Sequence, residues 1–152
     1  DDLKQCAFSI HLIGSDRGEM FGNTDTSLPE PQNEITAQFA EASKKADIPI
    51  LGIRAVQAGA LTSEMDREPH ESGRDIKDFE DYERAEPFRN LAAEWQITPS
   101  VLAYRYALSV EKVSSVILGV KNRNELLESL DAQSEGALTQ DQIDEIDKVL
   151  SK

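Results

Sequence analysis

The segment from Val116 to Glu128 constrains the fold of this chain more than any other. An apolar run is followed by a glycine, then by Lys121 and Arg123, and then by a helical pattern that begins after Asn122. A strand that runs directly into a capped helix is typical of a βα unit in a parallel sheet. The N–H groups and partial positive charge at a helix N-terminus favour anions. The segment therefore predicts an anion-binding βα turn.

The overall charge makes this basic pair informative. Acidic residues number 29 against 16 basic ones, which gives a net charge of -13. Nucleic acids and anionic membranes require a basic face, so we expect neither as a partner. Lys121 and Arg123 are either two surface cations or part of a local ligand site. Cations at a helix start are mildly unfavourable without a nearby anion, which favours the ligand site.

Composition fits a globular protein with one core. The chain has 152 residues, of which 39% are hydrophobic and 30% are charged. It contains no apolar run near the ~20 residues that span a bilayer and no signal segment, so we expect a cytoplasmic protein. The single cysteine, Cys6, excludes an internal disulfide. His11 and His70 lack neighbours at metal-ligand spacing, and we predict no metal site.

Strands and helices alternate along the sequence. Apolar segments predict strands at residues 6–13, 48–53 and 113–118, the second of them buried on both faces. Helices are expected at 33–46, at 81–96, from Thr98, after Asn122 and from Thr139, with loops at 14–32 and 63–81. The loop at 63–81 is expected to be exposed, with the acidic side chains from Asp75 to Glu83 solvated. The helix that starts at Thr98 is apolar nearly all round and should be buried.

This order predicts an α/β fold in which three parallel strands have flanking helices. Three strands leave both sheet edges unpaired, whereas a closed α/β barrel needs eight. We therefore expect residues 1–152 to form a single partial domain, a piece of a larger (β/α)8 (TIM) barrel. The first residue is Asp1 and not methionine, which is compatible with a longer reading frame, a processed chain or a fragment.

The motifs resemble those of the C-terminal half of the aldo-keto reductases, from about strand 6 of the barrel to the terminal helix. Residues 48–62, which end in Gly59-Ala60-Leu61-Thr62, resemble the seventh strand and its loop. Residues 97–108 resemble the penultimate helix, and residues 116–128 resemble the eighth strand with its cofactor turn. The resemblance covers residues 33–150 well and residues 3–17 more weakly.

The resemblance implies an NADP site, with NAD as the alternative cofactor. Residues expected to contact the cofactor are Ile53, Arg54, Gly59, Leu61, Gly119, Val120, Lys121, Asn122, Arg123, Glu125 and Glu128. The turn from Gly119 to Arg123 would hold the adenosine 2′-phosphate, and Glu128 would meet the adenine. Glu125 replaces the usual Gln or Arg, and Ser129 replaces the usual Asn. An acid at residue 125 would favour NAD, while Lys121 and Arg123 would offset it.

No catalytic residue is expected in this chain. In the family, the catalytic Asp, Tyr, Lys and His come from the first four strands, and this chain begins near the sixth. Tyr104 and Tyr106 lie in the helix expected to be buried, and Tyr82 has no lysine placed to lower its pKa. The chain alone is therefore expected to be inactive.

Two functions remain open from the sequence. The first is the cofactor-binding part of a reductase that transfers hydride between a nicotinamide cofactor and an aldehyde, ketone or alcohol. In that case the loop at 63–81 lies on the active-site face and shapes substrate access. The second is a non-catalytic nucleotide-binding or interaction half-barrel that self-associates. The open sheet edges would be covered by the remainder of the barrel or by a second copy.

Overall fold

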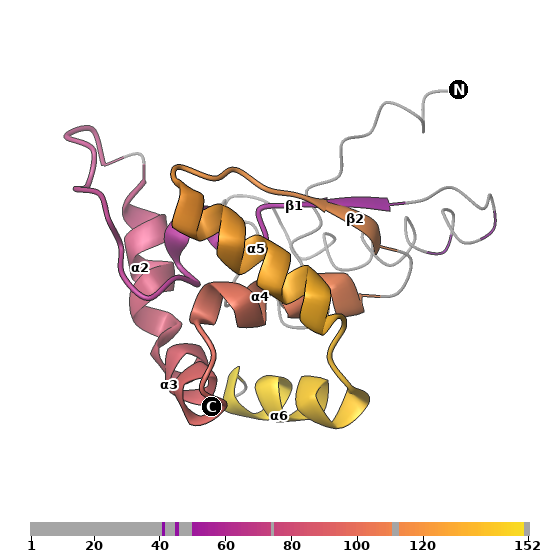
Figure 1. Ribbon diagram of the computed structural model, residues 1–152. Coiled ribbons are helices and arrows are strands. Elements are labelled where there is room, and N and C mark those ends of the chain that lie inside the picture. Colours follow the sequence, from indigo (N-terminus) through magenta and orange to yellow (C-terminus); the bar gives the residue numbers. More distant parts are fainter. Residues whose placement is uncertain (1–40, 42–44, 46–49, 74, 111–112, 151–152) are drawn as a thin grey trace.

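The computed structural model describes residues 41, 45, 50–73, 75–110 and 113–150 (Figure 1). The elements are β1 (Ile50–Ile53), η2 (Gln57–Gly59), α2 (Ile76–Arg84), α3 (Glu86–Glu94), α4 (Pro99–Ser109), β2 (Val113–Ile117), α5 (Arg123–Glu135) and α6 (Gln140–Leu150). The strand expected at 6–13, the loop at 14–32, and Cys6 and His11 lie outside the described residues. Within the helix expected at 33–46, Glu41 and Lys45 are helical.

The two described strands pair in parallel, which confirms the α/β class of the prediction. The Cα partners run from Ile50 opposite Val113 to Ile53 opposite Ile117. The expectation that the first of these strands is buried on both faces is wrong, because Leu51 is 48% exposed. Ile117 on β2 is 55% exposed as well. The described helices lie on one side of this two-stranded sheet (Figure 1).

The chain between the strands departs from the prediction in two places. The expected loop at 63–81 ends early, because α2 begins at Ile76. Phe79 and Tyr82 are three residues apart, and this helical spacing is the sequence signal for α2. The charged residues around them obscure it. The helix expected at 81–96 is interrupted at Ala85 and resumes as α3. Pro87 explains the interruption, because proline lacks an N–H and suits the first turn of a new helix.

Helix starts that depend on local capping are confirmed. The Thr98 hydroxyl accepts a hydrogen bond from the Val101 N–H, and Pro99 opens α4. At α6, the Thr139 N–H donates to Gln142, whose own N–H donates back to the Thr139 hydroxyl. This reciprocal pair forms a capping box at the helix start expected from Thr139.

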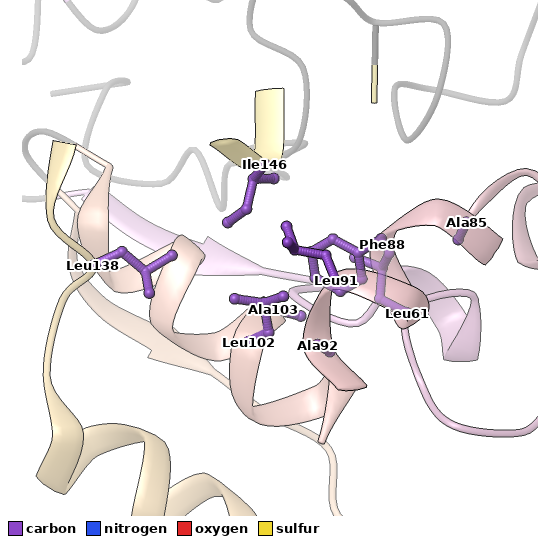
Figure 2. Close-up of a cluster of buried hydrophobic side chains, with 9 residues drawn as sticks. All are labelled: Leu61, Ala85, Phe88, Leu91, Ala92, Leu102, Ala103, Leu138 and Ile146. Carbon is purple, nitrogen blue, oxygen red and sulfur yellow. The ribbon is translucent and has the colours of Figure 1, made fainter. Parts of the chain in front are cut away.

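The core lies where α3, α4 and α6 meet. The buried cluster comprises Leu61, Ala85, Phe88, Leu91, Ala92, Leu102, Ala103, Leu138 and Ile146. In Figure 2, Leu102 and Ala103 lie between Leu138 on one side and the group around Phe88 and Leu61 on the other. The burial expected for the helix that starts at Thr98 is confirmed, since most of α4 up to Tyr104 is buried. Each large side chain fully buried here contributes about 1.5–3 kcal/mol.

One acidic residue is buried against expectation. Asp81, which the sequence places in a solvated acidic run, is 1% exposed. Its Oδ1 accepts from Arg84, whereas Oδ2 has no hydrogen-bond partner among the described residues. Burial is the main cause that raises the pKa of Asp81, and the hydrogen bonds from Arg84 and Gln57 oppose it. The carboxylate is therefore costly to keep charged in the folded state.

The raised pKa predicts how stability depends on pH. The folded state binds the Asp81 proton more tightly than the unfolded state, so the contribution of this group is most favourable at low pH. The contribution is lost as the pH rises from about 4 through the raised pKa. We expect Asp81→Asn to become progressively more stable relative to the wild type between about pH 4 and pH 7.

Urea unfolding over this pH range measures the difference. Glu80→Gln, which removes an exposed carboxyl from the same helix, is the control for net charge. A difference between Asp81→Asn and the wild type that shrinks with rising pH would contradict the prediction.

Candidate anion-binding site

The carboxyl ends of β1 and β2 lie at one edge of the sheet. Parallel pairing sets Ile53 opposite Ile117, so the turn that begins at Arg54 and the turn that begins at Gly119 leave the sheet side by side. In α/β sheets, ligands bind beyond the carboxyl ends of the strands. These two turns, separated by about sixty residues in the chain, form the candidate site.

The turn after β2 is a capped helix start. The Asn122 side-chain oxygen accepts from the N–H groups of Asn124 and Glu125, at 2.9 and 3.1 Å. The Glu125 carboxylate reaches back and accepts from the Lys121 N–H at 2.7 Å and from the Asn122 amide at 3.2 Å. The capped helix start expected after Asn122 is confirmed. Glu125 therefore belongs to the turn itself, and its negative charge lies at the helix N-terminus.

Lys121 connects this turn to the loop that follows β1. Its ammonium pairs with the Asp66 carboxylate and lies 4.0 Å from Glu125. The hydrogen bond from Lys121 lowers the pKa of Asp66, and the same bond raises the pKa of Lys121. The side chain of Lys121 remains 64% exposed. Arg123 is exposed at the first position of α5 and has no salt-bridge partner among the described residues.

The turn after β1 has an unusual backbone. Arg54, Gln57, Ala58 and Gly59 all have positive φ, and a Cβ at Gly59 would come within 3.2 Å of the Met65 sulfur. Three of these residues carry side chains that rarely adopt such angles, which makes the conformation costly. The Arg89 guanidinium donates to the Ala60 carbonyl at 3.3 Å and lies over the Tyr82 ring, which helps hold the turn.

Ion pairs fix the loop between this turn and α2. The Asp78 carboxylate on α2 forms an ion pair with the Arg67 guanidinium at 2.6 Å, and it lies 3.6 Å from the Arg54 guanidinium. Arg67 also donates to Asp75 at 3.0 Å. The hydrogen bond from the His70 N–H is the main cause that lowers the pKa of Asp75. His70 is exposed, as expected.

The predicted cofactor-contact residues differ in their exposure to solvent. Lys121, Arg123 and Val120 are exposed at the turn, and a Cβ at Gly119 would meet nothing within 4 Å. Ile53 and Glu128 are partly buried near the sheet and on α5. Leu61 is fully buried in the core, so its side chain is not available to a ligand. The two turns, residues 54–62 and 119–123, together offer cations and backbone groups to a ligand. They adjoin the apolar end of β1 at Ile53.

A family model for the aldo/keto reductase family matches residues 27–151. The chain belongs to the aldo/keto reductase family. Membership supports oxidoreductase function with a nicotinamide cofactor and a carbonyl substrate, and it implies a TIM barrel. The described residues contain a two-stranded parallel sheet with flanking helices. No curated protein shows significant similarity to the chain. None of the described helices is long and apolar enough to cross a membrane.

Sequence reasoning misses one residue at this site. Asp66 lies 55 positions from Lys121 and carries no local pattern that distinguishes it from its acidic neighbours. Only the tertiary structure brings the two turns together.

Among the described residues, no cluster of three or more His, Cys, Asp or Glu side chains is placed to hold a metal ion.

The ion pair predicts a shift that is directly measurable. We expect Asp66→Asn to lower the pKa of Lys121 toward that of an unpaired lysine, because the main cause of its elevation is removed. NMR titration of labelled lysine side chains would follow this group. Asp75→Asn, the same substitution in the same loop beside Arg67, is the matched control and should leave Lys121 unchanged. An unchanged Lys121 pKa in Asp66→Asn would show that the pair does not form in solution.

Proposed function

We propose that residues 1–152 form a single partial domain, the C-terminal cofactor-binding part of an NADP-dependent aldo-keto reductase barrel. The complete protein would transfer hydride between the nicotinamide cofactor and an aldehyde, ketone or alcohol. The cytoplasm is the proposed location. The observation that carries this proposal is the exposed pair Lys121 and Arg123, placed at a capped helix start beside the turn that follows β1.

The proposed contacts follow the geometry of the two turns. The 2′-phosphate would be held by Lys121, Arg123 and the backbone from Gly119 to Asn122. Cations and the N–H groups of a helix N-terminus both stabilise a bound phosphate. Glu128 would meet the adenine further along α5. On the other turn, Arg54 would reach the pyrophosphate, Ile53 would pack against the nicotinamide, and Gly59 and Leu61 would contribute backbone groups.

Glu125 sets the balance between the two dinucleotides. Its carboxylate lies at the same helix start as Lys121, and Asp66 supplies a second negative charge. A 2′-phosphate must compete with both acids for the Lys121 ammonium, whereas a 2′-hydroxyl is not repelled by them. NADP therefore depends on Lys121 and Arg123 together, and NAD is the alternative cofactor.

The chemistry of this part is binding and orientation. The nicotinamide supplies the hydride when bound, and the remaining part of the barrel would supply the proton donor and most of the carbonyl pocket. No residue of this chain is proposed as catalytic. Burial raises the pKa of Tyr104, which opposes a role for its hydroxyl as an acid near neutral pH.

The cofactor proposal makes a direct prediction. In the whole protein, Lys121→Ala with Arg123→Ala should weaken NADPH binding by about tenfold to a hundredfold, because two charge-assisted contacts to the 2′-phosphate are removed. NADH, which has no such phosphate, should weaken by less than about threefold. Fluorescence titration of each dinucleotide gives both dissociation constants.

A matched control removes the same charge elsewhere. Lys45→Ala with Lys148→Ala deletes two exposed cations that lie outside both turns. This variant should leave the ratio of the NADPH and NADH constants unchanged. An equal effect of Lys121→Ala/Arg123→Ala on both dinucleotides would show that these residues do not recognise the 2′-phosphate.

The loop from residue 63 to Asp75 would shape substrate access, since it leaves the same sheet edge as the cofactor turn. Deleting residues 68–72 retains Asp66, Arg67 and all of α2. We expect this deletion to change the relative kcat/KM of small and bulky carbonyl substrates by several-fold, with the NADPH dissociation constant as the internal control. Equal kcat/KM ratios in the deletion variant and the wild type would refute the role.

Exposed apolar side chains favour one alternative. Several large hydrophobic residues are about half exposed in this structure: Leu51, Ile117, Leu126, Leu127 and Leu130. A non-catalytic nucleotide-binding half-barrel that self-associates would cover them with a second copy, whereas in a reductase the remainder of the barrel would do so. Sedimentation of residues 1–152 distinguishes the two, because only the alternative requires a well-folded oligomer of this chain alone.

A further inference from the structure

Two polar side chains from neighbouring helices meet the end of the turn after β1, residues 54–62. The Arg89 guanidinium on α3 donates to the Ala60 carbonyl at 3.3 Å, and its central carbon lies 3.9 Å from the centre of the Tyr82 ring on α2. The Tyr82 hydroxyl donates to the Ser63 carbonyl at 2.9 Å. Arg89 and Tyr82 are both partly buried, which strengthens the attraction of a cation to an aromatic face. The stacked pair therefore holds the backbone at two points three residues apart.

The first of these points directly follows the strained part of the turn. Gln57 and Ala58 have positive φ angles, which residues with side chains rarely adopt, and Gly59 has a φ of 102°. The hydrogen bonds inside this stretch are local: the Gly59 N–H donates to the Val56 carbonyl and the Ala60 N–H donates to the Gln57 carbonyl. Local bonds do not fix the turn relative to the helices. Since a strained backbone persists only where its surroundings hold it, the contact from α3 restrains this conformation.

Apolar packing fixes the two ends of the turn more firmly than its centre. Ala55 is buried in a cluster with side chains of α4, and Leu61 is buried in the core with side chains of α3 (Figure 2). Between them, Ala58 is exposed and Gly59 has no side chain to pack. The hydrogen bond from Arg89 therefore acts on the part of the turn that side-chain packing restrains least.

We propose that Arg89 is a positioning residue for the turn after β1, and that it acts through the Ala60 carbonyl with the Tyr82 ring as its support. It contacts no ligand itself. By tying the turn to α3, it keeps the backbone at residues 57–59 in one conformation and so fixes the direction in which the turn leaves the sheet.

The consequence for cofactor binding rests on the proposed function, whereas the consequence for the backbone does not. The turn begins directly after Ile53, and the proposed contacts of Ile53 and Arg54 are the nicotinamide and the pyrophosphate. NADP and NAD share both groups. Arg89 therefore supports binding of either dinucleotide, whereas Lys121 and Arg123 discriminate between them.

The first experiment measures the turn without any ligand. In the whole protein, Arg89→Met keeps an unbranched apolar stem but removes the charge and the N–H donors. It should accelerate hydrogen exchange of the Ala60 and Thr62 amides by about threefold to tenfold, because one hydrogen bond and one cation–π contact are lost. Arg89→Lys retains a cation over the ring and should restore most of the protection. Exchange as fast in Arg89→Lys as in Arg89→Met would overturn the role of the charge.

Arg105→Met is the matched control for this experiment. Arg105 lies on α4, and its guanidinium donates to the Gly136 carbonyl at 3.0 Å, at the end of α5 and away from the turn. The control therefore loses the same kind of bond to a backbone carbonyl. It should accelerate exchange of the Gly136 amide and leave Ala60 and Thr62 unchanged. Equal exchange at Ala60 and Thr62 in Arg89→Met, Arg105→Met and the wild type would overturn the positioning role.

The second experiment measures dinucleotide binding. In Arg89→Met, the dissociation constants of NADPH and NADH should both rise by about threefold to tenfold, and their ratio should stay within about twofold of the wild-type ratio. Arg105→Met should change neither constant, which separates positioning of the turn from a general loss of stability. Unchanged constants in Arg89→Met, or a rise for NADPH alone, would overturn the link to cofactor binding. If the wild type binds neither dinucleotide, the proposed function fails, and the exchange result still decides the positioning role.

Discussion

The parallel pairing of β1 with β2 is the contact on which the candidate site depends. It joins residues 50–53 to residues 113–117 across the whole α2 to α4 segment. A parallel pair needs a long connection, and here α2, α3 and α4 supply it. Two of these helices, α3 and α4, also form the core with α6. Because both strands leave the sheet at the same edge, a basic helix start and a strained turn become neighbours. Neither turn alone has the charges and backbone groups that the pair provides.

The strained turn is supported from the helices around it. Positive φ angles at Arg54, Gln57 and Ala58 cost free energy, and the surrounding structure must offset that cost. The Tyr82 hydroxyl donates to the Ser63 carbonyl at 2.9 Å, and the Arg89 guanidinium lies over the same ring. The break before α3 matters here, because it lets residues from two helices meet the same short loop.

Local patterns in the sequence predicted more of the structure than long-range ones. Thr98, Asn122 and Thr139 each cap a helix through atoms within three residues, and all three caps are present. Pro87 is a local signal for the interruption at Ala85, although the charged residues around it favour one continuous helix pattern. The expected burial of the strand at residues 48–53 was too high, because the pattern does not say which face other elements cover. Glu125 was identified as a departure from the family pattern, but its place inside the cap required the structure.

Other features have no signature in the sequence. Asp66 meets Lys121 across 55 residues, and the burial of Asp81 depends on packing around α2. Both residues belong to acidic stretches in which every carboxylate has the same local appearance. Their roles follow from where the chain returns in space, which single-sequence reasoning does not specify.

The register between β1 and β2 sets the relative position of the two turns that form the candidate site. Between Ile50 and Leu51 the partner strand advances by two residues, from Val113 to Ser115, so Ser114 is an extra residue in β2. One strand residue spans about 3.3 Å, which is close to the length of a hydrogen bond. This irregularity near the start of the strand therefore determines, at its far end, how far the Lys121 turn extends beyond the turn after β1. In this fold, geometry several residues away from a ligand decides which charges can reach it.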